Sequence, residues 1–142
     1  MPSFKTTRQV PYSATQMYDL VADVARYPEF LPLCEALTIR QRTETADGKP
    51  QLVANMTCGY KAIRETFTTR VTLDEEHRAI HVEYIDGPFR YLNNDWRFVP
   101  AANGGCRVHF HIDYALKSAM LGPVSYTHLR AHETNDLISY AG

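Results

Sequence analysis

Apolar and polar residues alternate with a period of two through most of residues 36–116, and this pattern constrains the fold more than any other feature of the chain. The longest run covers residues 106–116, where every second residue is apolar. Such alternation is typical of strands with one buried face. Turn-forming residues separate the runs, at 47–48, 59–60, 86–88 and 103–105. Strands joined by turns of this length pair antiparallel, so we expect about six strands in one antiparallel sheet.

A helix is predicted ahead of the sheet. Ser13 and Gln16 have the spacing of a capping box, so the helix should begin at Ala14. Apolar residues then recur at helical spacing and form one buried stripe, made of Ala14, Met17, Tyr18, Val21 and Ala25 with Leu20 and Val24 beside them. The helix must end before Pro28, and only a short second turn fits around residues 29–31. These elements predict an α+β fold in which short N-terminal helices cover one face of a curved antiparallel sheet.

Length and charge limit the number of domains and the classes of partner. A chain of 142 residues is long enough for one hydrophobic core but not for two. Fifteen Lys and Arg residues against sixteen Asp and Glu give a net charge of −1, which argues against DNA as a partner. No apolar run reaches the roughly 18 to 20 residues that span a bilayer, and the first residues carry no presequence pattern. We therefore expect one soluble, cytoplasmic domain.

No catalytic or metal-binding constellation is predicted. The carboxylates lie in or near turns, without a nucleophile or an oriented base beside them. Cys106, His109 and His111 are close in sequence, but alternation puts the two histidines on one strand face and the cysteine on the other. We predict a protein with no metal, no cofactor and no catalytic role. The apolar face of the curved sheet would then hold either a filled core or a ligand cavity.

Two unusual motifs support a family resemblance. Residues 20–34 read LVADVARYPEFLPLC, and residues 86–92 read DGPFRYL, followed by Trp96-Arg97-Phe98. They resemble the coenzyme Q-binding START-domain family, with the patterns VxDVxxYPxFxPxC and DGPFxxLxxxWxF. The resemblance implies a helix-grip fold, in which a curved sheet wraps a long C-terminal helix and leaves an apolar tunnel. It further implies that the chain binds a polyprenyl quinone or a similar lipid and carries it for respiration, with transient contact at the inner membrane.

Alternation selects the residues that would line this tunnel. The sheet contributes Met56, Phe67, Val82, Tyr84, Trp96, Phe98, Phe110 and Ile112, and the helical segment places Val24, Tyr27, Phe30 and Leu31 at the mouth. Ordinary core packing is the alternative for each of these side chains.

The motif residues Asp23, Pro28, Pro32, Gly87 and Pro88 are expected to shape two loops at the tunnel entrance. Pro28 and Pro32 would stiffen a loop that presents Phe30 and Leu31. Gly87 and Pro88 would force a reversal that presents Phe89. Both loops could then meet a membrane surface.

Two other functions stay open. Ribosome-association toxins of the RatA type are similar in the same motifs, and their partner would be the large ribosomal subunit. A polyketide aromatase or cyclase of the same superfamily would need acid–base groups on the inward face. The polar residues to inspect there are Tyr84, Tyr114, Glu65 and Asn94.

The last nineteen residues resemble a translated sequencing adapter. Residues 124–134 read VSYTHLRAHET, and residues 138–141 resemble a second primer-derived segment. We therefore expect residues 1–123 to form an incomplete START-like domain and residues 124–142 to be a non-native tail. On this interpretation the long C-terminal helix of the family is missing, which would leave the apolar face of the sheet exposed.

Overall fold

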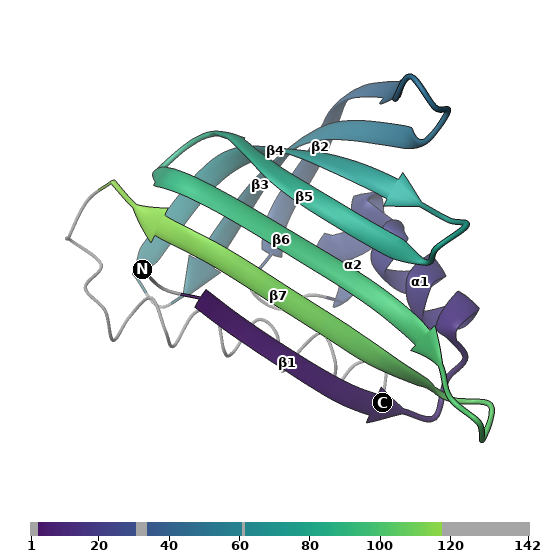
Figure 1. The fold of residues 1–142 in the computed structure, drawn as a ribbon. Helices are drawn as coiled ribbons and strands as arrows, with labels where there is room; N and C mark the ends of the chain where they lie inside the picture. Colours follow the sequence, from purple (N-terminus) through teal and green to yellow (C-terminus); the bar gives the residue numbers. More distant parts are fainter. Residues whose placement is uncertain (1–2, 31–33, 61, 118–142) are drawn as a thin grey trace.

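The structure is a computed structural model that describes residues 3–30, 34–60 and 62–117 (Figure 1). Its helices are α1 (Ala14–Ala22), the 3-10 helix η1 (Val24–Arg26) and α2 (Tyr27–Phe30). Its strands are β1 (Ser3–Val10), β2 (Cys34–Glu44), β3 (Pro50–Tyr60), β4 (Ile63–Asp74), β5 (Ala79–Asp86), β6 (Phe89–Pro100) and β7 (Cys106–Leu116). The expected non-native tail and the expected loss of the C-terminal helix concern residues outside this description.

All seven strands form one antiparallel sheet in the order β1-β7-β6-β5-β4-β3-β2. β1 and β2 follow each other in the chain but lie at opposite edges of the sheet, with α1, η1 and α2 between them. Figure 1 shows the helices on one face of the curved sheet, which we call the inner face. α1 packs against β6 and β7, and α2 packs against β2. The predicted α+β architecture is therefore confirmed.

The densest part of the core lies where α1 covers the sheet. Phe98 and Val108, which are cross-strand partners on β6 and β7, are 2% and 0% exposed. Tyr18 of α1 meets Phe98 edge to face, with ring centroids 6.3 Å apart. Burying a side chain of this size stabilises the fold by about 2 to 3 kcal/mol. The stripe on α1 thus attaches the helix to this end of the sheet.

The start of α1 follows from local sequence, whereas its end does not. The predicted capping box is present, since Gln16 N–H donates to Ser13 Oγ over 3.1 Å and Ser13 N–H donates to Gln16 Oε1 over 2.9 Å. The expected continuation of the helix to Ala25 is wrong, because Asp23 leaves the helical region at φ −82° and ψ 68°. The 3-10 turn that follows shifts the helical phase, so Val24 is buried and Ala25 is exposed.

The predicted break at residues 59–60 is also wrong, because β3 continues through Gly59 to Tyr60. A Cβ on Gly59 would collide with the Glu35 carboxylate. That carboxylate accepts a hydrogen bond from Arg64 Nε over 3.0 Å. Gly59 is therefore explained by the Glu35–Arg64 ion pair that lies over the strand and not by a turn.

Among the described residues, no helix has the length and apolar character needed to cross a bilayer.

Candidate functional site

Four aromatic rings gather on the inner face at the end where β5 turns into β6. We call this group, made of Phe67, Tyr84, Phe89 and Tyr114, the aromatic cluster. Phe89 is at its centre and meets the other three rings edge to face, with centroid distances of 5.5 Å to Phe67, 5.6 Å to Tyr84 and 6.1 Å to Tyr114. Edge-to-face packing of this kind adds about 0.5 to 1.5 kcal/mol per pair to the burial of the rings.

The position of Phe89 depends on a β-bulge. Phe89 pairs with Leu116 and Tyr91 pairs with Ala115, so Arg90 is an extra residue on β6. Without the bulge, strict alternation from Leu92 would turn Arg90 toward the inner face. The expectation that a loop presents Phe89 is thus corrected, because Phe89 is the first residue of β6 and its ring packs inside the cluster.

Gly87 makes the tight turn ahead of this bulge possible. Its φ is 144°, a conformation that side-chain-bearing residues rarely adopt. A Cβ there would lie 2.6 Å from the Cβ of Phe67. The turn therefore contacts the aromatic cluster directly, and Lys117 N–H closes its other side by donating to Pro88 O over 2.8 Å.

Tyr84 gives the cluster a polar group. The backbone N–H of Phe89 donates to the Tyr84 hydroxyl oxygen over 3.1 Å. Burial, with the nearby Asp86 charge adding to it, raises the pKa of Tyr84 despite the opposing effect of that hydrogen bond. Like any tyrosine hydroxyl, that of Tyr84 is protonated at neutral pH and can donate a hydrogen bond.

Next to the cluster, the inner face continues as a band of aliphatic side chains that are only partly buried. Val82, Ile112 and Met56 belong to it, from β5, β7 and β3. Asn94 of β6 lies between Ile112 and Val82 in register. Its amide donates to His111 O over 2.9 Å and accepts from Trp96 Nε1 over 3.0 Å. The polar groups of this buried residue are thus used within the sheet.

The remaining predicted tunnel residues fall into three groups. Trp96, Phe98 and Phe110 are 7%, 2% and 7% exposed, and Val24 is 3% exposed, so these four side chains belong to the core cluster. Tyr27 is half-buried and donates its hydroxyl proton to Val21 O over 2.5 Å. The Phe30 side chain and residues 31–33, with Leu31 and Pro32, lie outside the description. Of the motif residues expected to shape the entrance loops, Asp23 and Pro28 are exposed.

Sequence reasoning missed two residues of β2 and underrated a third residue. Leu37 and Ile39 pack against the core from the inner face and pair with Met56 and Ala54. Tyr114 was expected only as a polar exception, yet its ring belongs to the aromatic cluster. The alternation in residues 36–44 was the signal that could have identified Leu37 and Ile39.

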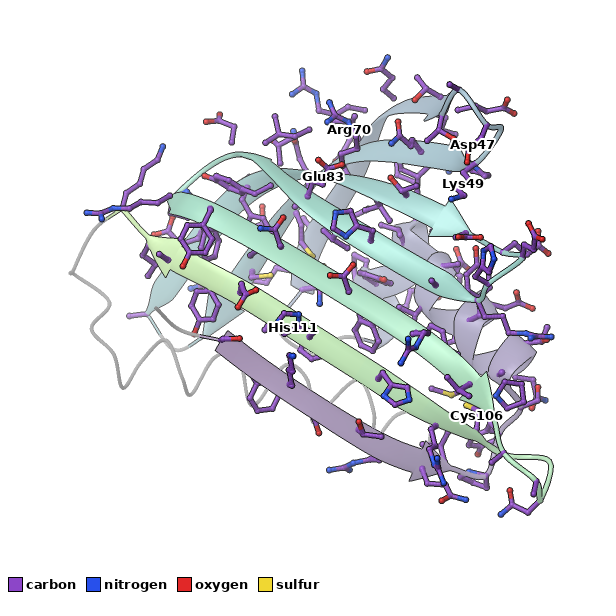
Figure 2. The ribbon with its side chains drawn as sticks, in the orientation of Figure 1. Asp47, Lys49, Arg70, Glu83, Cys106 and His111 are labelled. Carbon is purple, nitrogen blue, oxygen red and sulfur yellow. The ribbon has the colours of Figure 1, made fainter. Side chains whose placement is uncertain are left out.

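The inner and outer faces differ in chemistry. On the outer face, Arg70 and Glu83 are cross-strand partners, and His111 lies on β7 (Figure 2). His81 Nδ1 lies 2.6 Å from Asp95 Oδ1 there. In the described parts of the chain, no three side chains are placed to hold a metal ion. The inner face is instead apolar and aromatic with few polar atoms, which suits a hydrophobic ligand.

Comparison with known proteins gives a family match over most of the chain. Residues 10–131 match the family described as polyketide cyclase/dehydrase and lipid transport. The match runs past residue 123, the expected end of the native domain, and that boundary stays a prediction.

Two relatives and one solved structure illustrate what the chain is similar to. Ribosome association toxin RatA of Escherichia coli is 38% identical over 121 residues, which is 85% of this chain and 73% of the relative. The mitochondrial coenzyme Q-binding protein coq10 of Schizosaccharomyces pombe is 26% identical over 123 residues, covering 86% and 74% of the two chains. The fold is similar to that of a START superfamily protein from Mycobacterium smegmatis, with a TM-score of 0.79, 20% identity, and coverage of 98% and 96%. The START-like fold class is thereby confirmed.

Proposed function

Because the chain belongs to the polyketide cyclase/dehydrase and lipid transport family, we propose that it binds a polyprenyl quinone, or a lipid of the same long apolar type, and carries it without chemical change. The binding surface is the partly buried band of the inner face together with the aromatic cluster. The observation that carries this proposal is the cluster itself, which gathers four rings around one turn.

The chemistry of the surface suits the two parts of such a ligand. A quinone ring is flat and carries carbonyl oxygens, so it can stack among the aromatic rings and accept a hydrogen bond from the Tyr84 hydroxyl. An isoprenoid tail has no polar atoms and would lie along the aliphatic band that includes Val82, Ile112 and Met56. Trp96 Nε1 already donates a hydrogen bond to Asn94, so these two polar side chains are engaged with each other, and in this proposal they do not react with the ligand.

Exposed apolar surface near the cluster supports loading from a membrane. Ile85 is an extra residue on β5, since Thr68 pairs with Asp86 and Thr69 pairs with Tyr84. Its side chain is 42% exposed at the same turn that carries Gly87. In this proposal Ile85 touches the bilayer surface while the lipid enters past the aromatic cluster.

Lipid extraction from the purified chain tests the proposal. Mass spectrometry should detect an isoprenoid quinone that co-purifies with the chain. Val82→Asp places a charge on the aliphatic band and should remove the quinone, whereas Val53→Asp is the matched control because Val53 faces outward beside Arg70. Circular dichroism checks that both variants are folded before their lipids are compared. Folded wild-type protein that carries no quinone, in cells that make it, would contradict the proposal.

A second candidate function is association with the large ribosomal subunit, and the 38% identity to RatA favours it. Co-sedimentation with ribosomal subunits, repeated over a series of salt concentrations, tests it. Specific association should give saturable binding to the large subunit alone. A polyketide cyclase function would need acid–base groups on the inner face, where Asn94 is already engaged within the sheet and Glu65 lies near the start of β4, two residues from Phe67 of the aromatic cluster.

A further inference from the structure

Cys34 and Cys58 are directly opposed across two paired strands. Cys34 is the first residue of β2 and Cys58 lies near the end of β3, and the two are cross-strand partners. Directly opposed residues of an antiparallel pair point to the same face of the sheet. Both cysteines are thiols in the structure. The register thus brings two nucleophilic side chains together although 23 residues separate them in the sequence.

We propose that Cys34 and Cys58 form an oxidation site, at which a low-molecular-weight disulfide such as oxidised glutathione converts the two thiols to an intrachain disulfide. Opposed residues in antiparallel strands have Cα atoms about 4.5 to 5.5 Å apart, which lies within the usual disulfide span of about 4.4 to 6.8 Å. The strand pairing therefore provides the geometry without a rearrangement of the sheet.

The backbone at this position can adjust to the bond. β2 is an edge strand, and its register shifts between Cys34 and Ala36, which leaves Glu35 as an extra residue. Opposed Cβ atoms are about 4.5 to 5.5 Å apart before oxidation and must approach to about 3.5 to 4.5 Å. An edge strand with a bulge makes that small movement more easily than a strand paired on both sides.

Exposure sets the order of the two exchange steps. Cys34 is 3% exposed, and its Sγ lies 3.6 Å from Ala36 O, to which the thiol donates. Cys58 is more exposed and should react first. Its thiolate attacks oxidised glutathione, forming a mixed disulfide and releasing one glutathione thiol. The Cys34 thiolate then attacks the Cys58 sulfur and releases the second glutathione thiol. Two protein thiols are oxidised and one glutathione disulfide is reduced.

Cys106 provides an internal comparison. It is 0% exposed and pairs with Val10 and Pro100, so the register gives it no cysteine partner. Burial raises the pKa of the Cys106 thiol, which further lowers its reactivity. Oxidation of the folded chain should therefore leave Cys106 reduced.

Peptide mapping tests the proposal. The folded chain is treated with oxidised glutathione, remaining thiols are alkylated, and the protein is digested with trypsin without reduction. The three cysteines fall in separate tryptic peptides, spanning 27–40, 43–61 and 98–107. The expected product links the first two peptides and has two hydrogens fewer than their sum, while the third is alkylated. Cys34→Ser and Cys58→Ser should each abolish the link, and Cys106→Ser should retain it.

Oxidation in denaturant provides the reference for an unfolded chain, which should give a mixture of all three pairings. A native sample with the same mixture, or with Cys34 and Cys58 alkylated separately, would overturn the proposal. As a second readout, linkage should slow amide hydrogen exchange at residues 36–38 by at least about tenfold, because it ties the start of the edge strand to β3. Unchanged exchange in fully linked protein would also count against the site.

Discussion

The backbone N–H of Phe89 donates to the hydroxyl oxygen of Tyr84 over 3.1 Å, and the rings of the same two residues meet edge to face with centroids 5.6 Å apart. The β5–β6 turn and the aromatic cluster are therefore one structural unit. A substitution in the turn should therefore alter the packing of the rings, and a substitution in a ring should alter the conformation of the turn.

Replacing Gly87 with alanine should destabilise this unit. The substitution puts a Cβ 2.6 Å from the Cβ of Phe67 and 3.0 Å from its Cα, at a φ of 144°. We expect a loss of about 3 to 4 kcal/mol in the free energy of unfolding, measured by urea titration. Gly48→Ala is the control, because Gly48 also has a positive φ but would meet no atom within 4 Å. Its loss should be about 1 kcal/mol. Equal losses would mean that contact with Phe67 is not important.

Replacing Asn94 with alanine should test the polar bridge inside the sheet. The change leaves Trp96 Nε1 and His111 O without the side-chain partners that they have now. An unsatisfied buried polar group costs about 1 to 3 kcal/mol, so the free energy of unfolding should fall by about 2 to 4 kcal/mol. Asn93→Ala, at the exposed neighbouring position, should change it by less than about 0.5 kcal/mol. A comparable effect of the two substitutions would argue against the bridge.

The pH dependence of stability should carry a contribution from Tyr18. Burial, reinforced by the charges of Glu75, Asp74 and Asp19, raises the pKa of Tyr18 to about 12 from an ordinary value of 10.0. As the pH rises, the unfolded chain therefore loses the Tyr18 proton before the folded chain does. The contribution of the protonated Tyr18 hydroxyl to the free energy of unfolding is complete below pH 10 and disappears between pH 10 and 12. Two pKa units correspond to about 2.7 kcal/mol. The difference in unfolding free energy between wild type and Tyr18→Phe should be constant from pH 7 to 9 and shift by about this amount by pH 12. A difference that stays constant to pH 12 would refute the prediction.

The capping box at the start of α1 should be needed to anchor the helix. Ser13→Ala removes the oxygen that accepts the Gln16 N–H, and we expect a loss of about 1 kcal/mol in thermal or urea unfolding. Ser13→Gly also lacks that oxygen, but glycine is a tolerated N-cap and should cost only a few tenths of a kcal/mol. If Ser13→Ala leaves the free energy of unfolding unchanged, the hydrogen bond from Gln16 N–H to Ser13 is not what stabilises this end of α1.

Periodicity was sufficient to predict the sheet, because alternation directly reports which strand face is buried. Predictions from periodicity were wrong where a helix break or a β-bulge shifts the apolar pattern by one residue. Asp23 interrupts the helical phase and leaves Ala25 exposed, and the bulge at Arg90 turns Phe89 inward. Neither change is visible in the apolar pattern, and the bulge at Arg90 depends on how β6 pairs with β7. The turn predicted at Gly59 is likewise absent from the structure. The residue that requires a glycine there is Glu35, which lies on another strand.

The candidate site was predictable to a similar degree. Phe67, Tyr84 and Phe89 were identified from alternation and from the DGPF motif, and the structure brings them into contact. The division of the other residues into core and partly buried band could not be read from the sequence. Phe98 and Val82 alternate in the same way, but only Phe98 lies under α1, where Tyr18 covers it.

Tryptophan fluorescence offers the most direct test of the central claim that the inner face binds a polyprenyl quinone. Trp96 is the single tryptophan of the chain and lies on the inner face, with its ring centroid 4.7 Å from that of Phe110. Titration with a polyprenyl quinone in detergent below its micelle concentration should quench this fluorescence saturably, at one ligand per chain. Val53→Asp should keep the quenching, and Val82→Asp should abolish it. Absence of saturable quenching in the folded wild-type chain, or equal quenching in both variants, would contradict the claim.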